Sequence, residues 1–484
     1  MHILFIYTNK NSQYRIPAGP AIILRVLNNL GHSVSLYDTT FTNSNYQEST
    51  DTREKQRTVL KTDMQNYIGK IKQVNHSDEL QEILNNKKPD LVFMSTAAHN
   101  YKFGISLLKI IKSHGDYTTL VGGIFPTICP DIVINNEYVD MVCVGEGEEA
   151  IIDLCERFGR PKDRNNNGKA YPLPSSEIPN IWIKQDGVVY RSRPKLVHNL
   201  DKVPYQDWSL FDKRHLWKAF VGKVWKSGGF ELSRGCPQHC NFCVEDQKRL
   251  NTIGDGTWRR EKTPGAVIKE LKYFIEKYDL ELITFGDMNF LSGSVEKTRR
   301  FSELYNNEIG LPFIIQSGPE TLINEEKVKL LKEMNCVTIS IGVESGVEED
   351  RQRVLNKKVS NAHIIKAFEN AKKYKIRTTA NYIIGLPFDT EEKIKRSIEF
   401  NLKIMPDSID VFYFIPFLGT HLFEIAQAEG LLPEHDEISA DILSEPYLEL
   451  PGLSKRRMVG LHAEFVERYN ERFAKLGMQH GLFE

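Results

Sequence analysis

The sequence predicts an α/β protein built from two largely parallel sheets, with a helical region at its C-terminal end. In residues 1–159, short β-rich apolar runs alternate with amphipathic helical stretches. A turn-rich segment interrupts this rhythm from residue 160, and the alternation resumes after residue 225 at near-regular spacing. Strands that alternate with helices favour parallel sheets. We therefore expect four regions: 1–159, a linker at 160–225, 226–430, and 431–484.

The first region is expected to be a doubly wound, Rossmann-like domain. Its polar stretch Asn43–His76 is interpreted as an insertion with some helix. The expected strands are His2–Thr8, Ser33–Tyr37, Leu91–Thr96, Thr119–Gly122 and Met141–Val144, and the expected helices are Pro20–Leu30, Phe103–His114 and Glu148–Phe158. In open sheets of this kind, ligands bind at the carboxyl edge of the strands.

The third region is expected to be a partial (β/α)6, TIM-like barrel. Before it, the linker contains one small β element, a hairpin about Asp186-Gly187. The expected strands are Gly229–Ser233, Leu282–Asp287, Pro312–Ser317, Val337–Val343, Arg377–Ile384 and Ser408–Phe417, and the expected helices are Pro264–Tyr278, Val295–Asn307, Glu325–Met334, Ala362–Lys375 and Glu391–Ile404. A helical tail follows at Ser454–Leu476. In such barrels the chemistry lies at the C-terminal ends of the strands.

Composition narrows the class of protein. The 484 residues are 40% hydrophobic and 26% charged, with 63 basic and 64 acidic residues. A net charge of −1 argues against a protein that mainly holds a nucleic-acid backbone. The longest apolar run is too short to span a membrane, and the N-terminus reads as a strand without a charged leader. Seven cysteines, an odd number in a large chain, indicate a reducing compartment, so a cytoplasmic location is expected.

Three of the cysteines form a cluster. Cys236, Cys240 and Cys243 have the spacing C-x3-C-x2-C, and no fourth cysteine lies nearby. Three thiolates on one loop favour an iron–sulfur cluster with one open iron site. A zinc site that uses His239, and structural or redox thiols, remain alternatives. The isolated Cys129, Cys143, Cys155 and Cys336 lie in or beside apolar runs and are expected in the core.

The cysteine loop and its place after the first barrel strand resemble the radical S-adenosylmethionine (radical SAM) enzymes. The resemblance implies that the three cysteines hold a [4Fe–4S] cluster, whose fourth iron is chelated by SAM. It also implies reductive cleavage of SAM to a 5′-deoxyadenosyl radical. Further landmarks across the barrel match that family's SAM site. The residues that the resemblance assigns to SAM are Phe242, Gly286, Asp287, Gln316, Glu344 and Tyr382.

Two of these assignments have plain structural alternatives. Asp287 is the implied partner of the SAM ammonium, although an aspartate in this place is also common in an ordinary turn after a strand. Glu344, implied near the SAM carboxylate and ribose, is otherwise a helix-capping acid.

A second resemblance concerns the first region. Its glycine-containing loops VGGIFPT and VGEGEE resemble those of the cobalamin-binding domains that precede some radical SAM barrels. The residues assigned to cobalamin are Pro17, Ser95, Thr96, Gly122, Gly123, Phe125, Pro126, Gly145, Glu146 and Gly147. Two departures stand out. The D-x-H-x-x-G motif, which supplies a lower axial histidine, is absent, and Phe125 stands where the family often has histidine. A degenerate domain without cofactor is the alternative.

Together the resemblances imply a cobalamin-dependent radical SAM methyltransferase that acts on an unactivated carbon. The cofactors implied are a [4Fe–4S] cluster, SAM and cobalamin, with an external flavodoxin- or ferredoxin-like electron donor. Cyclisation, ring rearrangement or C–C bond formation without methyl transfer is the first alternative, and a corrinoid or iron–sulfur sensor is the second. The substrate, a small molecule or a peptide, cannot be identified from the sequence, and no residue is assigned to catalysis beyond cofactor binding.

Overall fold

The computed structural model describes residues 1–9, 15–43, 49–158, 178–252, 257–290, 292–433 and 445–481. The chain divides into two compact units. The first unit contains Met1–Tyr46, Ile68–His215 and Gln247–Arg260, and the second contains Gln47–Tyr67, Leu216–Asp246 and Glu261–Glu484. The expected turn-rich text at 160–177 lies outside the described residues. No helix in the described part of the chain is both long and apolar enough to cross a membrane.

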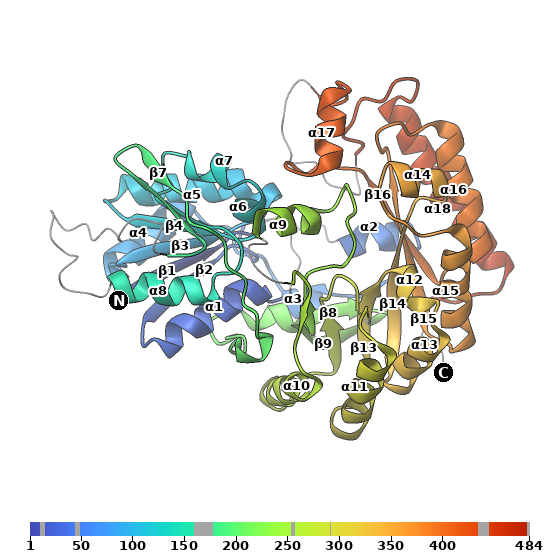
Figure 1. Cartoon of the computed structure of the whole chain (residues 1–484), viewed down its shortest axis with the longest axis horizontal. Coiled ribbons are helices and arrows are strands. Elements are labelled where there is room, and N and C mark those ends of the chain that lie inside the picture. Colours follow the sequence, from blue (N-terminus) through green and yellow to red (C-terminus); the bar gives the residue numbers. More distant parts are fainter. Residues whose placement is uncertain are drawn as a thin grey trace. The chain divides into compact units, whose positions relative to one another are not determined.

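The first unit contains a seven-stranded sheet of order β2-β1-β3-β4-β5-β6-β7 (Figure 1). The parallel strands are β1 (His2–Tyr7), β2 (Ser33–Asp38), β3 (Leu91–Ser95), β4 (Thr118–Gly122) and β5 (Met141–Cys143). The helices include α1 (Ala18–Asn29), α4 (His76–Lys87), α5 (Tyr101–Ser113), α6 (Ile124–Ile128), α7 (Pro130–Ile134) and α8 (Glu148–Phe158). The expected doubly wound sheet is thus confirmed, and its central strands are buried because helices cover it.

The predicted hairpin extends this sheet. Strands β6 (Ile181–Gln185) and β7 (Val188–Tyr190) are antiparallel, and β6 pairs with β5. Asp186 and Gly187 have φ values of 51° and 78°, which is the backbone that a two-residue hairpin turn requires. The small β element of the linker therefore belongs to the sheet of the first unit.

The second unit contains a seven-stranded sheet of order β16-β15-β14-β13-β12-β9-β8 (Figure 1). Its six parallel strands are β9 (Lys223–Phe230), β12 (Leu282–Phe285), β13 (Phe313–Ser317), β14 (Cys336–Glu344), β15 (Arg377–Ile384) and β16 (Ser408–Tyr413), and β8 (Trp217–Phe220) is antiparallel to β9. Because β16 and β8 are free edges, the sheet is a half-barrel. The six predicted strands and the partial (β/α)6 barrel are confirmed.

Helices follow the strands as the sequence predicts. They are α10 (Pro264–Tyr278), α11 (Val295–Glu308), α13 (Glu325–Glu333), α15 (Asn361–Lys373) and α16 (Glu391–Ile404), and the C-terminal α18 (Lys455–Lys475) packs against α16. Side chains cap the N-termini of α10 and α15 by accepting backbone N–H hydrogen bonds. Thr263 accepts a hydrogen bond from the Ala266 N–H ahead of Pro264, and Ser360 accepts one from His363. Each such cap contributes about 1 kcal/mol to stability.

The insertion within residues 43–76 was expected in the first domain, but residues 47–67 belong to the second unit. Arg53 of α2 (Ser49–Lys55) forms an ion pair with Asp410 of β16, at 2.5 Å between Nε and Oδ1. Farther along, the Tyr67 ring lies 5.0 Å from that of Trp217 on β8. Because Asp410 is buried, it needs a cation, and the insertion supplies one. Residues 49–67 therefore contact strands at both edges of the half-barrel.

Candidate active site

The cysteine loop follows β9 and the short β10 (Ser233–Arg234), at the C-terminal end of the half-barrel strands. Gly235 has a φ of 84°, and this left-handed turn leads into Cys236. Cys240 is buried, whereas Cys236 and Cys243 are partly exposed, and all three are free thiols. The structure thus brings the three predicted ligands onto one short loop at the predicted edge.

A second loop supports the cysteine loop from the far side of the sheet. Asn241 donates through its backbone N–H to the Leu355 carbonyl at 3.0 Å and through Nδ2 to the Val354 carbonyl at 2.9 Å. Asn356 donates in turn to the His239 carbonyl at 2.7 Å. These contacts hold the backbone on both sides of Cys240. His239 itself pairs with Asp246 through Nδ1 at 2.7 Å, so its ring is already engaged.

Burial affects all three thiols. It raises the pKa of Cys240 to about 12 and that of Cys243 to about 11, and it also raises the pKa of Cys236. The Lys357 ammonium opposes this shift at Cys236 and Cys240, because a nearby cation favours the thiolate. Without metal the thiols are protonated near neutral pH, so iron binding must release protons.

Glu344 ends β14 and is paired with a lysine that the sequence analysis missed. Its backbone has a φ of 65°, at an irregularity in the pairing with β15. Lys357 donates to Glu344 Oε1 at 2.9 Å and to the Gly342 carbonyl at 2.7 Å. Burial lowers the pKa of Lys357, but Glu344 and Cys240 raise it above its ordinary value. No spacing motif connects Lys357 to the cysteines, because the loop 354–357 meets them only in three dimensions.

Asp287 is placed at the end of β12, as predicted, but its carboxylate is already occupied. Oδ1 accepts hydrogen bonds from Ser233 N at 2.7 Å and from Ser233 Oγ at 2.5 Å, and Oδ2 accepts one from Leu232 N at 3.0 Å. The residue is 2% exposed, and burial raises its pKa to about 6. Through these hydrogen bonds Asp287 fixes the backbone that leads into the cysteine loop, and its assignment to the SAM ammonium stays a prediction.

Tyr382 lies on β15, where the sequence places it, and its assignment to SAM stays a prediction. Its side chain is fully buried and packs against Phe465 of α18, with ring centroids 4.9 Å apart. Tyr382 therefore points to the helix side of β15, away from the barrel interior, because successive strand residues face opposite ways. Asn381 and Ile383, on the other face of the strand, are only partly buried.

The remaining predicted SAM residues lie at the expected edge. Phe242 is partly exposed directly before Cys243. Gly286 donates its N–H to the Phe230 carbonyl at 2.7 Å, and a Cβ there would meet only ordinary contact at 3.6 Å. Gln316 is partly buried, on the opposite face of β13 from the buried Ile315. These three positions stay predictions.

A buried carboxylate holds the loop after β15. Oδ2 of Asp389 accepts hydrogen bonds from Gly385 N at 2.8 Å and Leu386 N at 3.1 Å. Burial raises its pKa to about 7, and Asp350 adds to the rise. Gly385, at a φ of 77°, makes the turn possible. Asp389 thus shapes the glycine-containing loop that follows Tyr382 and β15.

We predict that Asp389→Asn weakens the pH dependence of stability. A raised pKa means that the folded apo protein holds a proton that the unfolded chain releases between about pH 4 and 7. The free energy of unfolding therefore falls as pH rises through that window, by roughly 1.4 kcal/mol per pKa unit. An asparagine oxygen can accept both N–H groups without a charge. Urea unfolding at pH 5 and pH 8 should show a smaller decline in the variant, and an equal decline in both proteins contradicts the assignment.

In the first unit, the predicted glycine loops lie at the C-terminal edge of the sheet. Gly123 follows β4 with a φ of 111°, and a Cβ there would lie 2.6 Å from the Thr96 carbonyl oxygen. Thr96 N donates to the Gly122 carbonyl at 3.0 Å, and Ser95 ends β3 beside it. The ends of β3 and β4 therefore approach each other closely, and that approach is what Gly123 permits.

Gly145 and Glu146 are engaged by the segment 247–260. A Cβ on Gly145 would lie 3.0 Å from Thr252 Cγ2, at a φ of 92°. Glu146 receives two hydrogen bonds from the buried Arg260 guanidinium, at 2.7 and 3.1 Å, and one from Val197 N at 2.6 Å. The assignment of both residues to cobalamin stays a prediction. Gly145 makes room for Thr252, and Glu146 anchors Arg260, a partner 114 residues away.

Four further residues, Phe125, Pro126, Gly147 and Pro17, also stay predicted cobalamin residues. Phe125 is 4% exposed and its ring lies 4.7 Å from that of Tyr101, so it fills the interior of the unit. Pro126 is buried beside it in α6. A Cβ on Gly147 would meet Ile23 at 3.2 Å. Pro17 precedes α1, and its carbonyl accepts the Ala21 N–H. Exposed at this edge instead are Ile124 and, on α9 (Val244–Thr252), Leu250, with 49% and 57% of their surface accessible.

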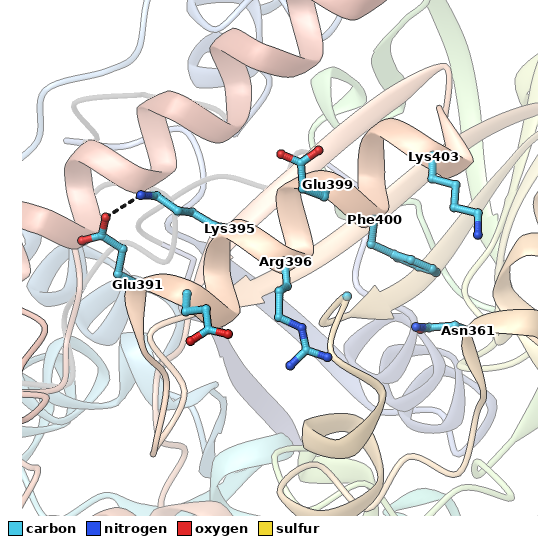
Figure 2. A pocket seen from close by; sticks show the side chains of 9 residues that line it. Asn361, Glu391, Lys395, Arg396, Glu399, Phe400 and Lys403 are labelled. Atoms are coloured by element: carbon cyan, nitrogen blue, oxygen red, sulfur yellow. Dashed lines mark ion pairs between the residues drawn. The ribbon is translucent and has the colours of Figure 1, made fainter.

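A groove in the second unit is not part of this site. It measures about 770 Å³ and lies beside α16, where Figure 2 shows acidic and basic side chains alternating along the helix. Glu391 pairs with Lys395 at 2.7 Å, and Arg396 pairs with Glu349 at 3.4 Å. The charges compensate one another, and none of the predicted site residues lines the groove.

Comparison with known proteins agrees with this geometry. Residues 12–154 match the B12 binding domain family, and residues 230–400 match the Radical SAM superfamily. The "Uncharacterized methyltransferase PH0819" of Pyrococcus horikoshii is 25% identical over 359 residues, 73% of each chain. The cytidylyl-2-hydroxyethylphosphonate methyltransferase of Streptomyces wedmorensis is 22% identical over 427 residues, 82% of this chain and 77% of that protein.

Two solved structures share the fold across nearly the whole chain. The cobalamin-dependent SAM radical enzyme OxsB, with aqua-cobalamin and SAM bound, has a TM-score of 0.68 at 16% identity, over 96% of this chain and 66% of that one. The radical SAM methyltransferase TsrM of Kitasatospora setae, with cobalamin and a [4Fe-4S] cluster bound, has a TM-score of 0.66 at 14% identity, over 96% and 90%.

The half-barrel with its cysteine loop, together with a separate B12-type sheet, defines a metalloenzyme with several cofactors. Residues 230–400 form a radical SAM domain, and residues 12–154 form a B12-binding domain on its N-terminal side in the sequence. Its cofactors are accordingly a [4Fe–4S] cluster, SAM and cobalamin. Catalysis is thereby favoured over the sensor interpretation.

The residues present fit these groups. Three thiols on one loop are a suitable donor set for a cluster. Near them, a buried carboxylate oxygen of Glu320 has no hydrogen-bond partner in the part of the chain that the structure describes. In the first unit, Ile124 and Leu250 offer exposed apolar surface to a large planar ligand. The zinc alternative gains no support, because the matched family is the radical SAM superfamily.

Proposed function

We propose that this enzyme is a cobalamin-dependent radical SAM methyltransferase that methylates an unactivated carbon of a small-molecule or peptide substrate. The proposal is supported by the presence of two sites in one chain. One is the three-cysteine loop at the carboxyl edge of the half-barrel. The other is the set of glycine-containing loops at the carboxyl edge of a sheet that matches the B12 binding domain. Two relatives whose names contain methyltransferase, and which align with 73% and 82% of this chain, agree with it.

When bound, these cofactors supply a carbon-centred radical on the substrate and a methyl group to join to it. The protein's own residues bind and orient. Cys236, Cys240 and Cys243 hold the cluster, with an external flavodoxin- or ferredoxin-like protein as electron donor. The supports at Asn241 and Asp287 keep the cysteine loop in place. Lys357, paired with Glu344, places a positive charge near Cys240, where an anionic group of SAM finds compensation.

We predict one S-adenosylhomocysteine and one 5′-deoxyadenosine for each methylated product. One SAM provides the radical, and a second restores the methyl group on the cobalamin. Anaerobic assays with methyl-deuterated SAM, and with candidate substrates chosen from the products of neighbouring genes, measure all three by mass spectrometry. The deuterated methyl group should appear intact in the product.

A cyclisation or rearrangement without methyl transfer is the second candidate. The anaerobic magnesium-protoporphyrin IX monomethyl ester cyclase of Rubrivivax gelatinosus is 23% identical over 360 residues, 72% of this chain and 60% of that protein. Product that forms with 5′-deoxyadenosine but never with S-adenosylhomocysteine would reject the methyltransferase and favour this candidate.

A further inference from the structure

Glu320 has an unpartnered carboxylate oxygen beside the cysteine loop. The residue lies in the short helix α12 (Pro319–Leu322), directly after β13. Its Oε1 accepts hydrogen bonds from Gln238 Nε2 at 2.9 Å and from Asn289 Nδ2 at 2.8 Å. Its Oε2 is buried and has no hydrogen-bond partner among the described residues. Oε1 of this carboxylate is therefore held by two hydrogen bonds, whereas Oε2, called the bare oxygen below, accepts none among the described residues.

The position of this bare oxygen is set by its neighbours. Gln238 lies between Cys236 and Cys240, so Glu320 is tied to the loop that holds the cluster ligands. Asn289 is 2% exposed and accepts hydrogen bonds from Ser317 Oγ and Gly318 N, both at 3.0 Å. The side chain of Glu320 folds back over Gly318, where a Cβ would lie 2.1 Å from Oε1. A glycine at 318 thus leaves the space that the carboxylate occupies.

Electrostatics favour a cation at this position. A buried carboxylate without a partner is costly unless a charge or strong donors compensate it. Glu320 forms no ion pair with the residues described here, and the nearest buried cation, Lys357, directs its hydrogen bonds to Glu344 and Gly342. An ammonium group is compact and brings three donors, so one fits the bare oxygen well.

We propose that Glu320, and not Asp287, is the carboxylate that receives the ammonium group of SAM. This inference rests on the proposed function, because it assumes that SAM binds the cluster with its amino-acid end. Both oxygens of Asp287 already accept hydrogen bonds, from the backbone N–H groups of Leu232 and Ser233. Glu320 follows β13, which is the neighbour of β12 in the sheet. Of the two carboxylates, only that of Glu320 has an oxygen without a hydrogen-bond partner among the described residues.

The test compares three nucleosides on the reconstituted, full-length protein. Glu320→Gln keeps an oxygen for Gln238 and Asn289 but removes the charge. We expect SAM and S-adenosylhomocysteine, which both carry the ammonium, to bind about ten- to a hundredfold more weakly to the variant. 5′-Methylthioadenosine lacks the amino-acid end, so its dissociation constant should not change. Anaerobic equilibrium dialysis measures all three, and the iron content confirms an intact cluster.

The matched control is Glu326→Gln. Glu326 lies on α13, the helix that follows α12, and its exposed carboxylate forms an ion pair with Arg299 of α11. This substitution should leave all three affinities unchanged. Equal binding of SAM to wild type and Glu320→Gln overturns the inference, as does an equal loss for 5′-methylthioadenosine. If wild type binds no SAM at all, the proposed function itself fails, which is a different result.

A second measurement covers the case in which Glu320→Gln does not reconstitute. A crystal structure of the wild-type holoenzyme with SAM should place the amino nitrogen within hydrogen-bond distance of Glu320 Oε2. A nitrogen bound to Asp287, or one with no contact to Glu320, overturns the inference.

Discussion

Replacing Cys236, Cys240 and Cys243 together with alanine should reduce the iron content of anaerobically reconstituted protein from about four per chain to none. The charge-transfer absorption near 400 nm should disappear with it. The variant should form no 5′-deoxyadenosine, because the cluster is the electron donor to SAM. This is the largest effect that we expect from any substitution in the chain.

The same variant should still bind cobalamin. The first unit has its own sheet and its own buried strands, so its stability does not depend on the cluster. Cys129→Ala and Cys336→Ala are the controls, because both thiols are buried in the core and lie outside the cysteine loop. They should retain full iron. Retention of iron by the triple variant would contradict the ligand assignment.

The second large effect is expected at Gly123. Alanine there would place a Cβ 2.6 Å from the Thr96 carbonyl oxygen, at a backbone φ of 111°. Backbone atoms cannot move aside as a flexible side chain can, so the ends of β3 and β4 must separate, at a cost on the order of a few kcal/mol. We expect cobalamin affinity to fall at least about tenfold, at a lowered melting temperature.

Gly123→Ala should leave the second unit intact. Its iron content and its formation of 5′-deoxyadenosine should match wild type, while methyl transfer is lost. Gly19→Ala in α1 is the matched control, because a Cβ there would have no atom within 4 Å. Spectroscopic titration with cobalamin compares the two variants. Equal affinity in both would mean that the close approach of β3 and β4 does not shape the cobalamin edge.

Local patterns in the sequence account for most of the secondary structure. The six half-barrel strands, the Asp186-Gly187 turn and the Thr263-Pro264 helix start were all predictable. Each depends on residues that are neighbours in sequence: an apolar run, a pair of residues that tolerate positive φ, or a side chain that caps its own helix. Such signals need no knowledge of the rest of the fold.

The environment of a single side chain was less predictable. Tyr382 lies in a strand that the sequence located correctly, yet it packs on α18 because strand position alone does not say which face meets helices. The sequence predicts that Glu146 contacts cobalamin, and the structure shows in addition that its carboxylate accepts hydrogen bonds from Arg260. The sequence places the insertion Asn43–His76 in the first domain. In the structure, residues 47–67 belong to the second unit, where Arg53 forms an ion pair with Asp410.

The sequence by itself determined the class of protein: the spacing of three cysteines and the order of strands are properties of the chain read in one dimension. The tertiary structure decided which polar groups remain available to a ligand. Asp287 and Glu320 are both carboxylates at strand ends, and only the folded chain shows that Leu232 and Ser233 fill the first, whereas the second keeps a bare oxygen. The physical reason is that a buried carboxylate takes whichever donors the fold brings to it, and those donors lie tens of residues away in sequence.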